Sequence, residues 1–187
     1  EMQRSLVGSE MCIRDRNDVT AEEYLEMIRL KTAVLLAASL KIGARLGGAS
    51  VEDADRLYDF GMHIGVAFQL KDDLLDVYGN AKVFGKNIGG DILCNKKTYM
   101  LIKALEHANA DQHNQLNSWI NAETFQPAEK IAAVTELYDR IGVKAVCENK
   151  ILEYSNRAME SLAAVSIAEE KKEELKKIIE NLIHREV

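Results

Sequence analysis

Three aspartates in one predicted helix are the residues whose types and spacing most directly indicate chemistry. The chain reads Asp72-Asp73-Leu74-Leu75-Asp76, so the outer two carboxylates are four residues apart and share one helix face. Like charges at this spacing repel each other by about 0.3 kcal/mol, and a divalent cation removes that cost. Mg²⁺ typically takes one or two carboxylates, keeps several waters and binds phosphate oxygens. The aspartate pattern has the form of such a magnesium and phosphate site.

The alternative is a solvated acidic face, which is the usual role of an acidic pair on a helix. The rest of this helix argues against that alternative, because it is apolar on nearly every other side. Its apolar residues are Val66, Ala67, Phe68, Leu70, Leu74, Leu75 and Val77. Three aspartates in such surroundings fit a site better than a surface that serves only solubility. Gln69 lies three residues before Asp72, on the same side of the helix.

The segment after the aspartates supplies the opposite charge. Lys86 follows Gly85, and Lys96 and Lys97 follow Asp91. Glycine lets the backbone approach an anion closely, and lysine acts as a point charge for phosphate. Each lysine alone is typical of a protein surface, but the ordered set after an aspartate motif favours phosphate binding.

A further lysine, Lys31, interrupts a stretch that is otherwise apolar from Leu30 to Leu40. A lysine on a buried face usually extends its ammonium to solvent or pairs with an acid. Both an aspartate across a helical bundle and a phosphate are compatible partners.

These residues must be positioned by helices. The chain has one proline, 11 glycines and 6% aromatic residues, and no stretch alternates as a strand does. Helical periodicity and capping signals, such as Thr20 with Glu23, predict helices over about 21–46, 51–78, 97–107, 111–121, 128–140, 143–164 and 168–184. Residues 80–95 break the pattern and predict a long loop, which in a compact domain is often functional. The expected fold class is an all-α helix bundle.

Bulk properties exclude several classes. The net charge is −6, and the sequence shows no basic stripe for nucleic acid. Cys12, Cys94 and Cys147 are too few and too far apart for a disulfide framework or a zinc site, which fits a reducing cytoplasm. The longest apolar stretch, 32–40, is too short for a transmembrane segment.

The first sixteen residues, EMQRSLVGSEMCIRDR, show no helical or strand period. Much of this string resembles translated sequencing-adaptor DNA. We therefore interpret residues 1–16 as a non-native leader and residues 17–187 as part of a single domain.

Taken together, the spaced motifs resemble the trans-isoprenyl diphosphate synthases, the polyprenyl synthetase family. The segments that carry the resemblance are Tyr24-Leu25, Arg29-Leu30-Lys31-Thr32-Ala33, Gly65-Val66-Ala67-Phe68-Gln69, Asp72-Asp73-Leu74-Leu75-Asp76, Gly85-Lys86, Gly90-Asp91 and Lys96-Lys97-Thr98. The resemblance implies an all-α isoprenoid-synthase bundle around a deep apolar cavity. It implies a Mg²⁺-dependent prenyltransferase that condenses an allylic diphosphate with isopentenyl diphosphate and releases diphosphate.

The resemblance also implies roles by position. Asp72, Asp73 and Asp76 match the second aspartate-rich motif of the family, with Asp72 as the direct metal ligand and Asp76 acting through water. The lysines that match those holding the allylic diphosphate are Lys31, Lys86 and Lys96. Thr32 and Gln69 match positions near the reacting carbons and the leaving oxygen, and Phe68 matches a wall near the homoallylic substrate. The catalytic set is therefore expected to be Lys31, Thr32, Gln69 and Asp72.

One departure from the family is large. A first aspartate-rich motif with flanking arginines is absent, and Asp55 with Asp59 does not supply it. We therefore expect the C-terminal part of a synthase, inactive alone, in which apolar surface is exposed where N-terminal helices would pack. The full-length protein is expected to be a homodimer.

Two alternatives stay open. A class I terpene cyclase shares a helical bundle and an aspartate motif but needs no isopentenyl diphosphate. A non-catalytic regulatory subunit would pair with a complete synthase.

Overall fold

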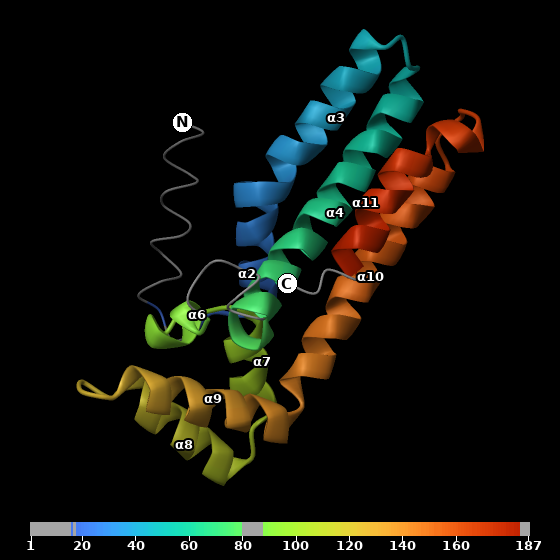
Figure 1. Cartoon of the computed structure of the whole chain (residues 1–187). Coiled ribbons are helices and arrows are strands. Elements are labelled where there is room, and N and C mark those ends of the chain that lie inside the picture. Colours follow the sequence, from blue (N-terminus) through green and yellow to red (C-terminus); the bar gives the residue numbers. More distant parts are fainter. Residues whose placement is uncertain (1–15, 17, 80–87, 184–187) are drawn as a thin grey trace. The chain divides into compact units, whose positions relative to one another are not determined.

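The computed structural model describes residues 16, 18–79 and 88–183, and every regular element in these ranges is helical (Figure 1). The α-helices are α2 (Ala21–Ile28), α3 (Val34–Leu46), α4 (Val51–Tyr78), α6 (Gly90–Leu93), α7 (Tyr99–His107), α8 (Ala110–Ile120), α9 (Pro127–Ile141), α10 (Val143–Ala163) and α11 (Glu173–Ile183). A π-helical segment, η1 (Arg29–Ala33), follows α2, and a 3-10 segment, η2 (Glu169–Lys171), precedes α11. The described ranges contain no strand, so the expected all-α class is confirmed. No helix in these ranges is both long and apolar enough to cross a membrane.

Most of the predicted leader, residues 1–15, lies outside the described residues. Arg16 is described, and its guanidinium pairs with Asp18 at 2.8 Å and with Glu23 at 2.9 Å. The predicted capping box is confirmed, because Thr20 accepts from the Glu23 backbone N–H and Glu23 accepts from the Thr20 backbone N–H.

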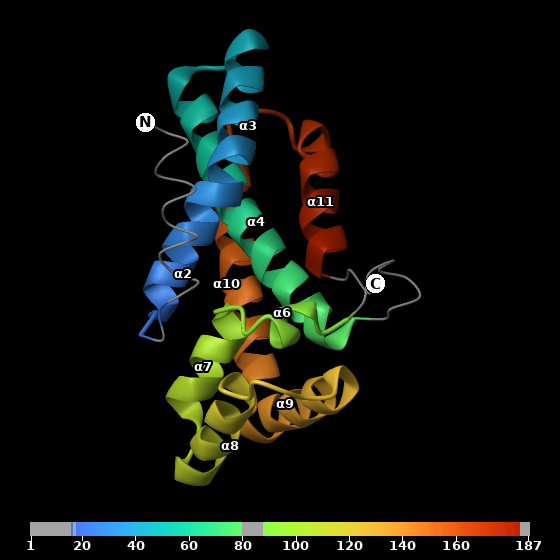
Figure 2. The same cartoon turned by 90° about the vertical axis from the view of Figure 1, so that its left-hand side faces the viewer.

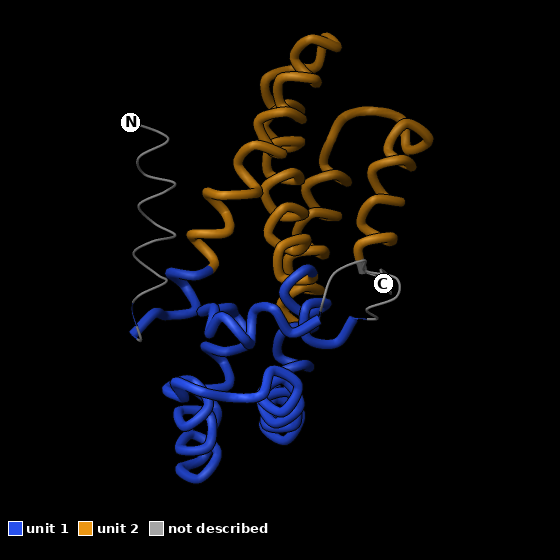
Figure 3. The backbone as a smooth tube through the Cα atoms, turned by 60° about the vertical axis from the view of Figure 1, so that its left-hand side comes forward, with its two compact units in different colours: residues 1–24, 72–148, 186–187 blue, residues 25–71, 149–185 orange. Residues whose placement is uncertain are grey.

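The chain divides into two compact units (Figure 3). Unit 1 comprises residues 1–24, 72–148 and 186–187, and unit 2 comprises residues 25–71 and 149–185. The divisions between them fall inside α2, α4 and α10 rather than in loops.

In unit 2, α3 lies alongside the first part of α4 (Figures 1 and 2). A row of small residues makes this close approach possible. A Cβ atom added at Gly65 would lie 2.6 Å from the Cα of Ala33, and one added at Gly61 would lie 2.7 Å from the Cα of Ala37. The α4 backbone therefore packs directly on η1 and α3, and only glycine leaves room for it.

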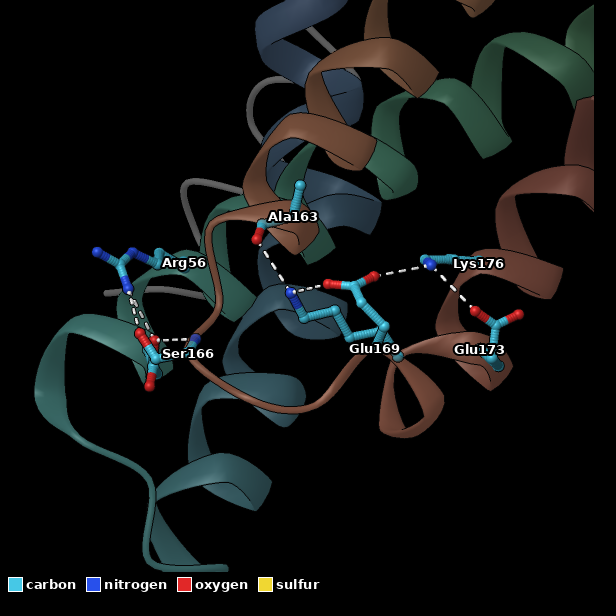
Figure 4. A network of polar contacts seen from close by, with 8 residues as sticks. Arg56, Ala163, Ser166, Glu169, Glu173 and Lys176 are labelled. Atoms are coloured by element: carbon cyan, nitrogen blue, oxygen red, sulfur yellow. Dashed lines mark hydrogen bonds and ion pairs between the residues drawn. The ribbon is translucent and has the colours of Figure 1, made fainter.

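A network of polar contacts fixes the segment between α10 and α11 (Figure 4). The Asp53 carboxylate, near the start of α4, accepts from the Ser166 backbone N–H at 2.9 Å and from the Arg56 guanidinium at 2.8 Å. Lys172, only 2% exposed, donates to the Ala163 carbonyl at 3.0 Å and to Glu169 at 2.8 Å. The lysine thereby satisfies a carbonyl at the end of α10 that has no helical partner.

The last predicted helix, 168–184, begins later in the structure than the sequence predicts. A 3-10 turn occupies Glu169–Lys171, and the α-helix starts only at Glu173. The Lys172 side chain follows this turn and donates to the Ala163 carbonyl and to Glu169. Periodicity cannot distinguish this turn from the first turn of an α-helix.

Unit 1 is built from shorter helices whose starts carry clear capping signals. The Thr98 hydroxyl accepts from the Leu101 backbone N–H at the start of α7, and Asn109 with Gln112 forms a capping box at the start of α8. Pro127 is the first residue of α9, a position that suits proline because the N–H it lacks has no helical partner there. The short helix α6 lies inside the predicted loop 80–95, of which residues 80–87 are outside the described residues.

Gly65→Ala should lower the free energy of unfolding by about 1–3 kcal/mol, because the new methyl group would overlap the Ala33 backbone. Gly43→Ala is the matched control, since a Cβ atom there meets no atom within 4 Å on exposed helix α3. That control should raise stability by about 0.5–1 kcal/mol. Urea unfolding measures both changes, and equal effects at the two positions would contradict the packing of α4 on η1.

Candidate functional site

The acidic end of α4, in unit 1, places the three predicted aspartates in different surroundings. Asp73 is 2% exposed, accepts a hydrogen bond from the Tyr24 hydroxyl and lies 3.4 Å from the Lys96 ammonium. Asp76 is half-buried and accepts from the Asp91 backbone N–H at 2.9 Å. Asp72 is also partly exposed. Asp73 and Asp76 are thus each held by a neighbouring hydrogen-bond donor.

Lys96 joins these groups, because its ammonium also lies 2.9 Å from the Asp91 carboxylate. Asp91 therefore contributes twice, through its backbone to Asp76 and through its side chain to Lys96. The structure thus brings together Asp73, Asp76 and Lys96 of the predicted site, with Tyr24 and Asp91 as additional members. We call these five residues the acidic cluster.

Burial dominates the electrostatics of the acidic cluster. It raises the pKa of Asp73 to about 6, although the Lys96 ammonium and the Tyr24 hydrogen bond oppose the change. Burial also raises the pKa of Asp76. Burial would lower the pKa of Lys96, but the carboxylates of Asp73 and Asp91 outweigh it and the pKa is raised. The Lys96 ammonium thus lies against two carboxylates, those of Asp73 and Asp91.

The donor set fits a hydrated magnesium ion better than a closed metal cage. In the described ranges, no three His, Cys, Asp or Glu side chains are grouped so that they could enclose a metal. The available donors around Asp72 and Asp76 are carboxylate oxygens, which hard cations prefer. Mg²⁺ commonly needs only one or two of them and completes its shell with water and phosphate oxygens.

Unit 2 carries the other predicted residues on η1 and α4. The Val34 backbone N–H donates to the Arg29 carbonyl, five residues earlier, which defines a π turn around Lys31 and Thr32. The Thr32 hydroxyl donates to the Gln69 side-chain oxygen at 3.3 Å. Lys31 is exposed. Turns of this kind occur frequently at functional sites.

The expectation of an uninterrupted α-helix over 21–46 is wrong at this turn. One extra residue is accommodated where Ala33 meets Gly65, and helical periodicity over a single turn does not reveal it. The close approach at Gly65 also explains the next contact, since Gln69 lies one turn further along α4 and meets Thr32.

An apolar groove of about 470 Å³ lies in unit 2. Leu36 and Leu40 of α3, Phe60, Ile64 and Phe68 of α4, and Leu175, Ile178 and Leu182 of α11 line it. Phe68 is 40% exposed, so its ring forms part of the open wall. A volume of this size is typical of a small-molecule pocket.

Some predicted residues are not placed, and some site residues were missed. Lys86 lies in 80–87, outside the described residues. The sequence analysis assigned no site role to Asp91 or to Lys130, a buried lysine that contacts Asn95. A signal for Lys130 existed, because it occupies the first position of an otherwise apolar stripe with Val134, Leu137 and Tyr138.

Comparison with known proteins places these features in a family. The polyprenyl synthetase family model matches residues 6–138. A short-chain isoprenyl diphosphate synthase of Methanothermobacter thermautotrophicus is 36% identical over 177 residues, which are 95% of this chain and 53% of that protein. The crystal structure of a geranylgeranyl pyrophosphate synthase superposes with a TM-score of 0.91 at 33% identity, covering 100% of this chain and 58% of the other.

A second similar structure is a complex with ligands. A geranylgeranyl pyrophosphate synthase from Corynebacterium glutamicum, complexed with isoprenyl diphosphate and magnesium, gives a TM-score of 0.86 at 28% identity, covering 98% of this chain and 53% of the other. The all-α fold and the family match define an isoprenoid-synthase-type protein. This chain belongs to the polyprenyl synthetase family. It spans about half the length of the curated relatives it matches.

The raised pKa of Asp73 predicts a specific pH dependence. Between pH 3.8 and about 6 the native state binds this proton more tightly than the unfolded chain does. The contribution of Asp73 to the free energy of unfolding therefore falls as pH rises through that window. Asp73→Asn should stabilise the metal-free protein at neutral pH by on the order of 3 kcal/mol, and the gain should vanish below pH 3.8.

Urea unfolding at several pH values, without divalent cations, measures this difference. Asp111→Asn, on exposed α8, is the control for losing one negative charge. A gain from Asp73→Asn that is the same at every pH would contradict a desolvated Asp73 carboxylate.

Proposed function

We propose that this chain carries the second aspartate-rich part of a magnesium-dependent prenyltransferase, which joins an allylic diphosphate to isopentenyl diphosphate and makes a longer trans-polyprenyl diphosphate. The observation that carries the proposal is the family match over residues 6–138, because this range includes every predicted site residue from Lys31 to Lys96. The relatives' names and the acidic cluster support the same reaction.

In this reaction the carbon–oxygen bond of the allylic diphosphate breaks, and its electron pair leaves with diphosphate. The double bond of isopentenyl diphosphate supplies the pair for the new carbon–carbon bond, and loss of a proton forms the new double bond. Bound Mg²⁺ neutralises charge that develops on the departing diphosphate. Fixed charges near that group act on the transition state, where electrostatic stabilisation contributes most.

The surroundings of each carboxylate support different roles in unit 1. Asp72 is the proposed direct ligand, since it is partly exposed, and Asp76 is proposed to act through water. Asp73 is buried against Tyr24 and Lys96, so its predicted role at the metal is more indirect than that of Asp72. Lys96, with Lys86, is proposed to hold the diphosphate.

In unit 2, the proposed roles divide between a polar pair and an apolar wall. Thr32 and Gln69, joined by a hydrogen bond, would face the reacting carbons and the leaving oxygen, with Lys31 on the diphosphate. Phe68 and the apolar groove provide hydrocarbon surface for an isoprenoid. Apolar walls also keep water from the allylic cation.

The exposed face of α3 supports the view that this chain needs the rest of a synthase domain. Leu35 and Leu46 are 74% and 85% exposed, and Ile42 lies between them on the same face. Such a stripe fits packing against further helices. We propose that catalysis requires the first aspartate-rich motif from those helices, and that the complete enzyme is a cytoplasmic homodimer.

The test of the site is diphosphate binding rather than turnover. Inorganic diphosphate together with Mg²⁺ should raise the melting temperature, with about 2 kcal/mol of added stability at saturating concentrations. Asp72→Asn should abolish most of this shift, whereas Asp111→Asn should keep it. No shift with wild type in the presence of both ligands would contradict the proposed site.

A second experiment separates the alternatives. Incubation with an allylic diphosphate alone should release no hydrocarbon, because a synthase needs isopentenyl diphosphate as the attacking group. Hydrocarbon formation under those conditions would favour a terpene cyclase. A change in the turnover of a complete synthase when this chain is added would favour a regulatory subunit.

A further inference from the structure

Lys130 in α9 is unusual for a lysine in its burial, in its partners and in its position along the helix. It is only 1% exposed, although lysine is rarely buried without an acidic partner. In the described part of the chain no carboxylate forms an ion pair with it. Its ammonium donates to the Asn95 side-chain oxygen at 2.7 Å and lies 4.2 Å from the centre of the Phe125 ring. It also lies in the first turn of α9, where the helix dipole disfavours a cation.

These departures carry a cost, since burial alone already lowers the pKa of Lys130. An apolar residue at this position would complete the stripe formed by Val134, Leu137 and Tyr138 without that cost. A costly residue that breaks several local rules points to a task beyond packing. The residues that Lys130 contacts indicate what that task is.

Asn95, the partner of Lys130, has a backbone conformation that side chains seldom adopt. Its φ is +50°, and it is the only non-glycine residue in the described ranges with a positive φ. Both ends of its amide are used, because the oxygen accepts from Lys130 and the nitrogen donates to the Ile120 carbonyl at 2.9 Å. The side chain thus ties the turn between α6 and α7 to the end of α8 and the start of α9.

The turn that Asn95 fixes presents the lysine of the acidic cluster. Lys96 is the next residue, its backbone N–H donates to the Asp91 carbonyl at 2.9 Å, and its ammonium reaches Asp91 and Asp73. Lys130, Asn95 and Lys96 also line one small cavity of about 20 Å³. A shift of the Asn95 backbone would move the Lys96 side chain away from the carboxylates.

We propose that Lys130 is a positioning residue for the diphosphate site, which acts through Asn95 to hold the Lys96 ammonium at the acidic cluster. This inference rests on the proposed function, because it takes Lys96 as a diphosphate-binding residue. Lys130 itself need not touch a ligand. Its charge strengthens the hydrogen bond to the Asn95 oxygen, which a neutral apolar side chain cannot replace.

The experiment compares variants of the chain of residues 1–187 in two assays. Lys130→Met removes the ammonium and keeps the length of the side chain, and Asn95→Gly removes the amide and keeps the backbone conformation accessible. Lys144→Met is the matched control, because Lys144 is exposed and also lies over an aromatic ring, that of Tyr78 at 4.8 Å. Calorimetry measures the Kd for inorganic diphosphate with Mg²⁺, and amide hydrogen exchange measures protection of the Lys96 backbone N–H.

We expect Lys130→Met and Asn95→Gly each to weaken diphosphate binding roughly tenfold, as loss of a supporting contact around a charged site commonly does. The double variant should be no weaker than either single variant, because both changes break the same contact. Exchange at Lys96 should become faster in both variants and stay unchanged in Lys144→Met.

Three results would overturn the inference. One is wild-type affinity in Lys130→Met, and another is an additive loss in the double variant, which would exclude action through Asn95.

If wild type itself does not bind diphosphate, the proposed function fails for this chain. Amide hydrogen exchange at Lys96 is then the only test of the inference. Faster exchange at Lys96 in Lys130→Met then supports the positioning role, and unchanged exchange is the third result that rejects it.

Discussion

The acidic end of α4 depends on one constraint, the burial of the Asp73 carboxylate. A charge with so little access to water must be compensated by its neighbours, here the Tyr24 hydroxyl and the Lys96 ammonium. Lys96 in turn requires Asp91, and the backbone of Asp91 is held by Asp76. Because these neighbours only partly offset the effect of burial, the pKa of Asp73 stays above its ordinary value. The cluster is thus arranged so that added positive charge lowers its energy.

Unit 2 depends on close backbone packing instead of charge. Glycine in α4 opposite alanine in η1 and α3 brings two helices near enough for Thr32 and Gln69 to meet. The larger side chains of the same helices, such as Phe60 and Phe68, line the apolar groove with α11. Taken separately, unit 1 presents a charged environment around Asp73 and unit 2 presents an apolar groove.

Sequence patterns predicted a helix well where residues close together in the sequence determine it. The capping pair of Thr20 and Glu23 predicted the start of α2, and a long apolar period predicted α4, because side chains near in sequence determine those features. The 3-10 turn at Glu169–Lys171 escaped prediction because apolar periodicity does not distinguish it from the first turn of an α-helix. The π turn escaped prediction because it accompanies contacts with α4, more than 30 residues away. The same reason hid Lys130, whose partner Asn95 lies 35 residues away. The assignments of Asp72 and Lys86 to metal and diphosphate stay predictions.

The π turn at Arg29–Ala33 has a consequence for how this segment can vary in length. Each residue added to or removed from a helix rotates everything beyond it by about 100° relative to what precedes it. Without the extra residue, the face that buries Met27 and Ile28 and the face that carries Ala33 and Ala37 would no longer be in phase. A deletion that a surface loop would absorb would here turn the small residues of α3 away from α4. Among homologues, the length of this turn should accordingly be constant.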